Sequence, residues 1–532
     1  MVGEDLTVAA AEAIGEGFSA LLDERGLGRR VVVGRDNRPS GEALHEALVR
    51  GLRATGTSVV EIGVVPTPLM YWSLHHLAVD AGIQITGSHN PPEFNGFKLC
   101  VGTSSLHGDG IQRLRALIDG ARFPAGHGSL RTEEIRARYI DDIVERIGPL
   151  SRKLHVVADC GNGVGALIAP ELLRRLGCNT TLLFAESDGT FPNHHPDPTV
   201  AENLQDLITT VRSIGADLGV AFDGDADRIG LVDSRGTIVW GDYLLILYAR
   251  DVLARTGRGQ SIIFDVKCSQ ALPDAITAAG GVPVMWKTGH SLIKEKMKEL
   301  HAPLAGEMSG HMFFTEGFYG HDDALYGAAR LLRIVADSGR DVTALLSDVP
   351  TFVSTPELRV DCPDDRRFEV VAAALRHFRA KYDVIDVDGV RILYGDGWGL
   401  IRASNTQPIL VVRFEATTAE RLAAMRGEVS EWLATQGVAF ARRLDEGPSL
   451  AVSRDRRRGA GTGRRARRGR DVLRMVVVRG DGGVVALPDA PRMGVGHAWR
   501  RICSRTRLRM GESLRRSAVD RVARAATAAC EL

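Results

Sequence analysis

The sequence lacks the features of an exported or membrane-bound protein. It has seven cysteines in 532 residues, none of them in a CxxC pair, and a chain of this length needs no disulfides to fold. No apolar run reaches the ~18 residues of a membrane span. The first residues, MVGEDLTVAAAEAIGEGF, carry acids where a signal peptide carries bases. We therefore expect a cytoplasmic protein with reduced thiols, no membrane span and no export.

Lysine is absent from the last part of the chain, where arginine is concentrated. Residues 448–532 contain 21 Arg and no Lys against 7 acidic residues, so the rest of the chain is acidic although the formal net charge is only +1. The dense like charge and few aliphatic residues around 453–471 predict a solvated segment without a core. We interpret this tail as disordered or as a non-native extension. If it is genuine, a nucleic-acid-binding arm is the alternative.

The remaining composition is that of an ordinary globular enzyme. Hydrophobic residues make up 44% and charged residues 25%, which argues against a fibrous or wholly disordered chain. Apolar strands such as RRVVVGRD recur, each followed by an amphipathic helical run, and this rhythm predicts α/β domains with parallel or mixed sheets. The later segment alternates strands and helices as a smaller α+β unit with partly antiparallel pairing. We predict α/β domains over 1–134, 135–236 and 237–348, an α+β domain over 349–447, and the tail over 448–532.

One short loop combines a serine with residues that would hold it rigidly. Residues 86–98 read TGSHNPPEFNGFK, with Ser88 ahead of two prolines and Lys98 ten positions further on. The prolines fix φ and the glycine relaxes it, which predicts a stiff turn after a strand. Adjacent Ser88 and His89 side chains usually point different ways and the pattern is not GxSxG, so a hydrolase triad is disfavoured. This stretch alone leaves a nucleophile and a plain polar loop both open.

A second loop, DGDADR, places three aspartates at alternate positions. Asp223, Asp225 and Asp227 follow the apolar strand ADLGVAF. Three carboxylates that face one point tolerate their repulsion best around a hard dication. We favour Mg²⁺ over Ca²⁺ because the glycine and glutamate of an EF-hand loop are absent. A solvated acidic turn is the alternative; the DxD of haloacid-dehalogenase phosphatases is a weaker one, because Asp227 stands where Thr or Val is usual.

Two glycine-containing loops offer groups that suit a sugar. Glu307, Ser309 and His311 in GEMSGHMFF combine an acceptor, a hydroxyl and an imidazole, which match vicinal sugar hydroxyls. The turn WKTGHS adds Lys287 and His290. A plain polar loop is the alternative reading of GEMSGHMFF.

A further turn, RASNTQP, has the composition of a phosphate cradle. It gathers one guanidinium with several hydroxyl and amide donors. The residues are Arg402, Ser404, Asn405 and Thr406. An ordinary polar turn is again the alternative.

Taken in order, TGSHNPPEFNGFK, DGDADR, GEMSGH and RASNTQP resemble the motifs of the α-D-phosphohexomutase superfamily. Within it, WKTGHSLIKEKMKE followed by LAGEMSGHMFF looks like the bacterial phosphomannomutase/phosphoglucomutase branch. The resemblance runs from about Gly3 to Leu444. It implies four domains around a central cleft and the reversible interconversion of hexose 1-phosphate and hexose 6-phosphate.

The resemblance also implies a role for each motif. Ser88 would carry the phosphoryl group and bind Mg²⁺ together with the three aspartates, Lys98 would assist proton transfer, and Arg228 would lie against the phosphoserine. The sugar would contact Lys287, His290, Glu307, Ser309 and His311, and its phosphate would contact Arg402, Ser404, Asn405 and Thr406. A hexose 1,6-bisphosphate would serve as intermediate and activator, and its other phosphate would then return to Ser88.

The chain departs from the family pattern at its start. Family members usually begin with a strand that carries a YDIRG-like segment, whereas this sequence opens at MVGEDLTVAAAEAIG. We therefore expect an edge strand and an active-site arginine to be missing. The alternative function is a truncated, weakly active or inactive paralogue that binds sugar phosphates or polyanions.

The expected partners are hexose phosphates, and we expect a monomer or a weak dimer. Mannose and glucose phosphates are not distinguished, because the sugar loop would contact hydroxyls that both share. Glucosamine phosphate is the alternative substrate, disfavoured because GEMSGH lacks the glutamine common in phosphoglucosamine mutases.

Overall fold

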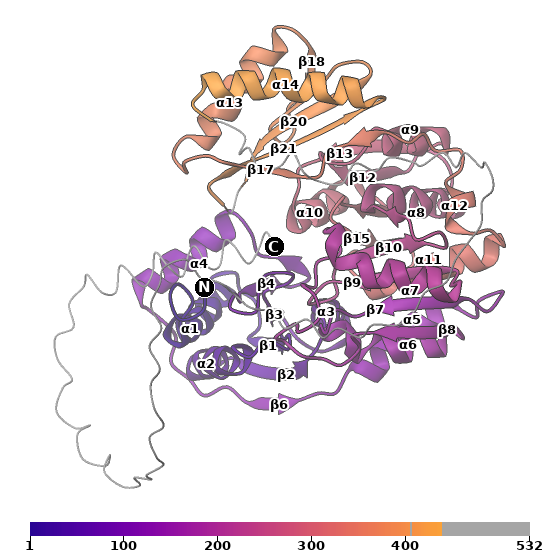
Figure 1. Ribbon diagram of the computed structural model, residues 1–532. Coiled ribbons are helices and arrows are strands. Elements are labelled where there is room, and N and C mark those ends of the chain that lie inside the picture. Colours follow the sequence, from indigo (N-terminus) through magenta and orange to yellow (C-terminus); the bar gives the residue numbers. More distant parts are fainter. Residues whose placement is uncertain (405–406, 439–532) are drawn as a thin grey trace, which may run out of the picture. The chain divides into compact units, whose positions relative to one another are not determined.

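The computed structural model describes residues 1–404 and 407–438, which form four β-sheets and the helices that cover them (Figure 1). The predicted arginine-rich tail and the end of the predicted fourth domain lie outside these residues. No helix in the described ranges is long and apolar enough to cross a membrane. The five cysteines within them are free, in agreement with the expected reduced thiols.

The first sheet is mixed, as predicted, with the strand order β5-β4-β3-β1-β2-β6. β1 pairs in parallel with β2 and β3, whereas β3–β4 and β4–β5 are antiparallel. Its strands are β1 (Arg30–Arg35), β2 (Ser58–Val64), β3 (Ala81–Ile85), β4 (Phe97–Val101), β5 (Ser104–Ser105) and β6 (Leu130–Thr132). Its helices are α1 (Val8–Glu24), α2 (Gly41–Ala54), α3 (Thr67–His76) and α4 (Asp109–Gly120).

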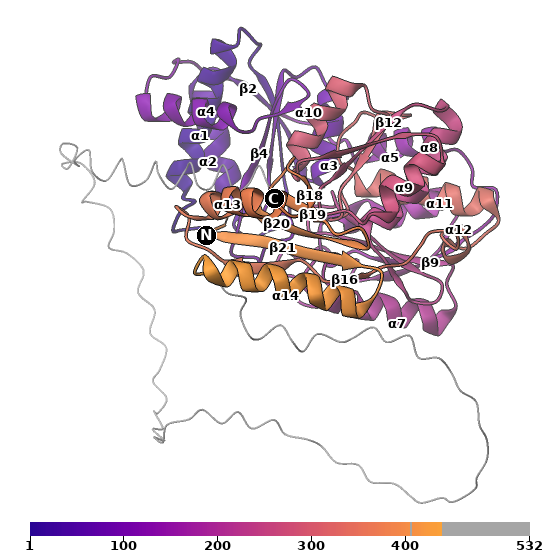
Figure 2. The same ribbon diagram turned by 90° about the horizontal axis from the view of Figure 1, so that it is seen from above.

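The valines of β1 explain why helices cover both faces of this sheet. Val31 and Val33 are buried in the core beneath α1, α2 and α4, whereas Val32 is buried in the core that includes residues of α3. A strand that alternates its side chains between two covered faces reads as a continuous apolar run. The two helical layers lie on either side of the strands in Figure 2.

The second and third sheets repeat this plan of parallel strands with an antiparallel end. Their orders are β11-β10-β9-β7-β8 and β13-β12-β14-β15. The strands are β7 (His155–Asp159), β8 (Asn179–Leu183), β9 (Leu218–Phe222), β10 (Ile229–Asp233), β11 (Ile238–Val239), β12 (Ser261–Asp265), β13 (Val282–Trp286), β14 (Leu304–Gly306) and β15 (Met312–Phe314). The helices are α5 (Arg136–Ile147), α6 (Ala169–Arg175), α7 (Gln205–Ile214), α8 (Gly241–Thr256), α9 (Ala271–Ala278), α10 (His290–Leu300), α11 (Ala324–Ser338) and α12 (Val342–Leu345), with 3-10 turns η1 (Val164–Leu167) and η2 (Ala201–Leu204).

The fourth sheet is antiparallel at every pair in the described part of the chain, which goes beyond the partly antiparallel pairing that the sequence predicted. Short hairpin connections impose this direction on the successive strands β18 to β21, whereas β16 and β17 pair with β21 from a distance in the sequence. The strands are β16 (Val353–Ser354), β17 (Leu358–Asp361), β18 (Asp383–Ile385), β19 (Val390–Leu393), β20 (Gly397–Ala403) and β21 (Ile409–Ala416). Helices α13 (Arg367–Arg379) and α14 (Ala419–Thr435) cover one face (Figure 1).

The described residues form four sheets, but the hydrophobic cores do not correspond to them one to one. One continuous core joins residues of the first three sheets, from Val32 to Val349, whereas the fourth sheet packs on its own core from Leu358 to Val438. A small cluster of Val266, Trp398 and Leu400 joins the third and fourth sheets. The three mixed sheets are therefore held by shared burial of apolar surface, whereas side chains of β19, β20 and β21 attach the fourth sheet to the loop after β12.

The predicted site motifs occupy equivalent places in these sheets. In each mixed sheet, the motif loop joins a parallel strand to its antiparallel neighbour: β3 to β4, β9 to β10 and β14 to β15. In the fourth sheet, the loop joins β20 to β21. Four separate motifs are thus carried by four hairpin connections.

Candidate functional site

The loop that carries Ser88 is held by a buried arginine from another segment. Arg38 follows β1, and its guanidinium donates to the carbonyl oxygens of Ser88 (2.7 Å), Asn90 (2.6 Å), Pro91 (2.5 Å) and Phe94 (3.1 Å). Its Nε donates to Asp36 at 3.0 Å. Four carbonyls on one guanidinium fix the loop more firmly than prolines alone would.

The backbone of Ser88 itself is strained. Its φ of 48° lies in the left-handed region, which costs a residue with a Cβ free energy and persists where the surroundings enforce it. The Ser88 N–H donates to Thr86 Oγ1 at 2.8 Å, and an added Cβ on Gly224 would meet the Ser88 carbonyl at 2.4 Å. The loop is therefore clamped between Arg38 and the aspartate loop.

The Ser88 hydroxyl contacts two groups. It donates to Asp223 Oδ2 at 3.0 Å, and its Oγ lies 3.2 Å from His89 Nδ1. The prediction that Ser88 and His89 point apart is wrong, since the positive φ of Ser88 brings the two side chains together.

The contact with His89 is nevertheless not that of a Ser-His base pair. Arg228 Nη1 lies 3.3 Å from His89 Nε2, and because a guanidinium only donates, Nε2 must accept. Burial, followed by the charge of Arg228, lowers the pKa of His89 well below its usual range, so the ring is neutral. Its one proton is on Nδ1 and is donated to Ser88 Oγ. A hydrolase triad remains disfavoured, for this reason rather than for the one that the sequence suggested.

The three aspartates converge, as predicted. Asp223, Asp225 and Asp227 are fully buried, and one carboxylate oxygen from each lies within 4.8 Å of the others. Asp223 Oδ1 accepts from the backbone N–H groups of Asp227 (3.0 Å) and Arg228 (3.1 Å). Burial first, and then the charges of Asp227 and Asp225, raise the pKa of Asp223 well above its usual range.

Such a cluster fits a hard cation. Asp225 Oδ1 is buried and has no hydrogen-bond partner within the described ranges, and all the donor atoms are oxygens. A bound dication would take this orphaned oxygen and relieve the repulsion that raises the pKa of Asp223. The chain thus contains a buried acidic cluster that could hold a metal ion beside Ser88.

Lys98 is part of the same cluster. β4 pairs with β3 so that Lys98 lies opposite Gln84, and its Nζ reaches Asp225 Oδ2 (2.9 Å) and Asp227 Oδ2 (2.5 Å). Burial would lower the pKa of this ammonium, but the charges of Asp225 and Asp227 outweigh burial and raise it. Lys98 therefore holds its proton in this arrangement.

The sugar-loop residues connect to the aspartates through His311. Its Nδ1 lies 2.7 Å from Glu307 Oε2 and its Nε2 lies 3.2 Å from Asp227 Oδ1. Burial and the charge of Arg228 would lower the pKa of His311, but Asp227 and Glu307 raise it to about 9. Ser309 Oγ lies 3.4 Å from Glu307 Oε2. The structure thus brings these three predicted residues to the acidic cluster.

Arg228 and His290 also lie at this cluster. Arg228 Nε donates to His311 Nε2 at 3.3 Å. Burial would lower the pKa of Arg228, but nearby carboxylates, above all Asp223, raise it. His290 is buried, with Nδ1 3.4 Å from Asp322 Oδ2. The turn just before it is tied in as well, because the Gly289 N–H donates to Glu307 Oε1 at 2.7 Å.

The phosphate-cradle residues lie at the end of β20. Arg402 is buried and donates from Nε to Asp388 Oδ2 at 3.0 Å, and the same oxygen accepts from the Thr288 N–H at 3.1 Å. Asp388 thereby joins the fourth sheet to the turn before α10. Ser404 Oγ accepts from the Gln407 N–H at 3.2 Å. Asn405 and Thr406 lie outside the described residues.

Lys287 is placed differently from its predicted companions. Its side chain is exposed, whereas the buried Lys267, which the sequence reasoning missed, lies on the loop after β12. Lys267 Nζ is 3.1 Å from Glu357 Oε2 and 3.8 Å from Asp265 Oδ2. Burial would lower its pKa, but Glu357, Asp265 and then Glu307 raise it. Lys267 follows the carboxyl end of a parallel strand, where ligands bind in open α/β sheets, and this position could have marked it as a candidate site residue.

We expect the two lysines to differ sharply in function. Lys267→Ala should lower kcat/KM for a sugar phosphate by about tenfold or more, because a buried ammonium beside the Glu307 loop is lost. Lys287→Ala, the matched control, should stay within about twofold because the side chain is exposed. Steady-state kinetics on variants with matching circular dichroism would check this. Equal losses, or a larger loss for Lys287→Ala, would contradict it.

Comparison with known proteins agrees with the order of these loops. Four family models match in sequence, described as phosphoglucomutase/phosphomannomutase alpha/beta/alpha domain I (residues 1–123), domain II (137–236), domain III (240–352) and the C-terminal domain (357–431). A Pseudomonas aeruginosa phosphomannomutase/phosphoglucomutase is 48% identical over 423 residues, 79% of this chain and 91% of that protein. A Neisseria gonorrhoeae phosphoglucomutase is 45% identical over 423 residues, with the same coverage of 79% and 91%.

A solved structure shows the same likeness in three dimensions. The crystal structure of a phosphoglucomutase/phosphomannomutase family protein from Burkholderia thailandensis matches with a TM-score of 0.76 and 44% identity. The match covers 82% of this chain and 95% of that one.

Proposed function

Because the chain belongs to the phosphoglucomutase/phosphomannomutase family, it is a phosphohexomutase, and we propose that Ser88 carries the phosphoryl group between hexose 1-phosphate and hexose 6-phosphate. The observation that carries the proposal is the position of the Ser88 hydroxyl. It is buried, strained and hydrogen-bonded to Asp223 within a cluster of three aspartates. A polar loop without a function would not be expected to keep a buried serine in a strained backbone conformation, because that conformation costs free energy.

The chemistry is a pair of phosphoryl transfers. The phosphorus–oxygen bond to Ser88 Oγ breaks as a hydroxyl of the hexose phosphate forms a new one, which gives a hexose 1,6-bisphosphate. The bisphosphate then turns within the site, and its other phosphate is returned to Ser88. A serine acceptor in place of water conserves the phosphoryl group and avoids net hydrolysis.

We propose that the aspartate cluster holds Mg²⁺. Asp223, Asp225 and Asp227, with an oxygen at Ser88, would be the ligands, and Mg²⁺ when bound would offset negative charge on the transferring group. The buried oxygen of Asp225 without a partner supports this assignment. Ca²⁺ needs more oxygen ligands in a looser shell.

The surrounding cations would orient the substrate and carry protons. Lys98 holds a proton at Nζ; it is proposed to give that proton to Ser88 Oγ as the phosphoryl group leaves and to take up the proton of the attacking sugar hydroxyl, so that the step balances. Arg228 would lie against the phosphate on Ser88, and Glu307 and Ser309 would bind sugar hydroxyls, with His290 and His311 beside them. Fixed groups of this kind stabilise the transition state without reorganising.

The fourth sheet would hold the phosphate that does not react. Arg402 and Ser404 are at the end of β20, and Asn405 and Thr406 are proposed as further donors of the same loop. Arginine suits this task because its planar fork pairs two hydrogen bonds with a phosphate. A firm grip at this end would retain the bisphosphate while it turns.

A coupled assay tests the proposal and its metal requirement together. With Mg²⁺ and glucose 1,6-bisphosphate, we expect conversion of glucose 1-phosphate to glucose 6-phosphate, loss of turnover with EDTA, and recovery when Mg²⁺ is returned in excess. Mannose and glucosamine phosphates assayed in parallel would define the substrate. Binding of sugar phosphates without turnover of any of the three would favour the alternative, a sugar-phosphate binder.

A further inference from the structure

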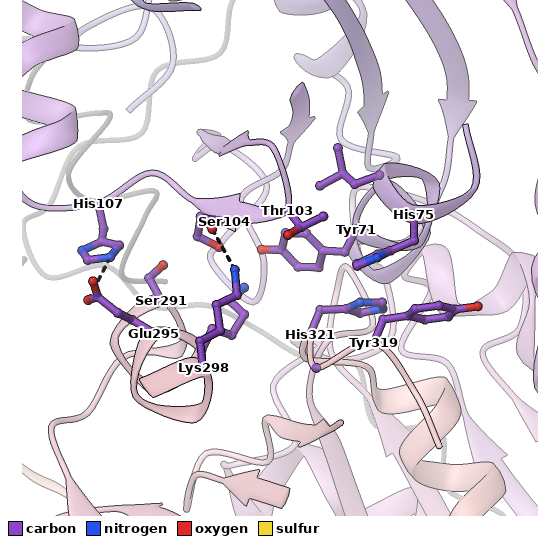
Figure 3. A pocket seen from close by; sticks show the side chains of 14 residues that line it. Tyr71, His75, Thr103, Ser104, His107, Ser291, Glu295, Lys298, Tyr319 and His321 are labelled. Atoms are coloured by element: carbon purple, nitrogen blue, oxygen red, sulfur yellow. Dashed lines mark hydrogen bonds and ion pairs between the residues drawn. The ribbon is translucent and has the colours of Figure 1, made fainter. Parts of the chain in front are cut away.

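A polar cavity lies apart from the serine and aspartate loops (Figure 3). It encloses about 200 Å³ between α3 and the β4–β5 turn on one side and α10 and residues 319–321 on the other. None of the residues assigned to phosphoryl transfer, metal or substrate lines it. Elements of the first and third sheets therefore share a cavity that the proposed reaction does not use.

Three buried polar side chains in its wall lack partners. Tyr71 Oη, Ser291 Oγ and both ring nitrogens of His321 have no hydrogen-bond partner within residues 1–404 and 407–438. These residues are only 3%, 6% and 5% exposed. His321 Nε2 has one charged neighbour, Asp323 Oδ2 at 3.5 Å. A buried polar group left unpaired is destabilising, so these atoms are available to hydrogen-bond a molecule in the cavity.

One end of the cavity is lined by the exposed Lys298 and Ser104 and the buried Lys294, with the exposed carboxylate of Glu295 beside them. Lys298 Nζ donates to Ser104 Oγ at 2.7 Å and has no carboxylate within ion-pair distance in the described part of the chain. Burial and then the charge of Lys294 lower the pKa of Lys298. The lining carboxylate, Glu295, is 3.5 Å from His107. An anion would relieve the repulsion between the two ammonium groups.

The other end is formed by aromatic rings, with the Arg146 guanidinium 4.7 Å from the centroid of Tyr319. The rings of Tyr319 and His321 are 1° from parallel with centroids 6.1 Å apart, and His75 stacks on Tyr319 at 4.8 Å. Burial, and then the neighbouring His321 and His76, lower the pKa of His75 to about 4, so His75 is neutral at pH 7. Figure 3 shows the lysine and hydroxyl groups on the left and the rings on the right. Ring faces contact carbon better than they contact a bare ion.

We propose that this cavity binds a small organic anion, a phosphate or carboxylate group on a short carbon skeleton. The oxyanion lies against Lys298, Ser104 and Ser291, and the carbon part lies on the rings of His75, Tyr319 and His321. The volume suits such a molecule, since it is below the ~300 Å³ at which pockets for drug-sized ligands begin.

The cavity is joined to the reaction site through one ion pair. Lys294 stacks over the Tyr71 ring at 4.1 Å and pairs with Asp322 at 2.8 Å. A carboxylate oxygen of Asp322 in turn lies within 4.8 Å of donor atoms of Asp227 and His311. An anion that attracts Lys294 weakens its hold on Asp322 and so changes turnover without competing with the substrate.

Calorimetric titration of the full chain tests the binding. The probes are glycerol 3-phosphate, citrate and inorganic phosphate, all in an Arg402→Ala background so that the proposed substrate-phosphate site does not contribute. We expect at least one organic anion to bind, and Lys298→Ala to weaken that binding by about tenfold or more. Lys296→Ala is the matched control on the same helix, because its ammonium lies over the Trp286 ring and pairs with Glu299. It should leave the affinity unchanged.

The outcomes separate the possible ligands. Binding of glycerol 3-phosphate alone identifies phosphate as the preferred group, and binding of citrate alone identifies carboxylate. Ser291→Ala removes one hydroxyl and guards against a folding defect in Lys298→Ala; it should also weaken binding. Binding of inorganic phosphate only, or binding that neither variant changes, or no binding, would overturn the proposal. None of these results depends on turnover, so they stand whether or not Ser88 carries the phosphoryl group.

Discussion

Ser88→Ala is expected to lower the kcat of the mutase reaction by roughly 10⁴-fold or more. The variant has no oxygen to carry the phosphoryl group, and the neighbouring groups cannot replace it. His89 Nδ1 is committed as a donor, and Asp223 is held by two backbone N–H groups. The substitution should barely affect folding, because the hydroxyl makes few contacts in a loop that Arg38 holds by its carbonyls.

The measurement is the coupled assay with each enzyme first incubated with glucose 1,6-bisphosphate. Mass spectrometry of the peptide that contains Ser88 should show one phosphoryl group in the wild-type chain and none in the variant. Ser213→Ala, an exposed serine whose hydroxyl donates only to the Thr210 carbonyl, is the control and should retain full activity. Turnover by Ser88→Ala at the wild-type rate, or a phosphoryl group on another residue, would contradict the assignment.

Arg38→Met is expected to lower the free energy of unfolding by about 3–5 kcal/mol and to reduce activity as well. The arginine side chain is fully buried and donates to four loop carbonyls and to Asp36. Without it, the carbonyls lose their donors and Asp36 becomes a buried carboxylate without its cation. The backbone at Ser88 would also be released from its strained conformation.

Chemical denaturation with and without substrate would measure both effects. Arg50→Met in α2 is the matched control: its guanidinium is exposed, 3.3 Å from Glu12, and should change stability by no more than about 1 kcal/mol. Burial raises the pKa of Asp36 and Arg38 opposes that rise, so the stability deficit of Arg38→Met should shrink as the pH is lowered and Asp36 takes up a proton. A deficit equal to that of Arg50→Met would show that the clamp contributes little.

Sequence motifs were sufficient to find the four loops of the site. Each motif has a rigid or glycine-rich turn next to an apolar strand, which is a local pattern that a sequence displays directly. Asp223, Asp225 and Asp227 converge as expected, because alternate residues in a tightly curved segment place their carboxylates on one side. The three mixed α/β sheets also followed from the alternation of strands and helices, whereas the fourth sheet was predicted as only partly antiparallel.

Residues that contact distant parts of the chain were harder to identify from the sequence. Arg38 is 50 residues before Ser88 in the chain and binds its loop only because β1 and β3 are neighbours in the first sheet. Lys287 stands in a glycine-containing turn that the sequence displays directly, whereas the burial of Lys267 depends on the packing of β12 and not on nearby sequence. No short-range pattern encodes either relationship.

By itself, the sequence pointed to the chemistry: a serine, three aspartates, a proposed sugar loop and a proposed phosphate loop, each in a local turn, in an order that matches one family. Only the tertiary structure decided how these groups behave. It set the tautomer of His89, the raised pKa values of Lys98 and His311, and the cavity between α3 and α10. The physical reason is that hydrogen-bond direction and pKa depend on burial and on charges brought from distant segments, which a linear pattern does not contain.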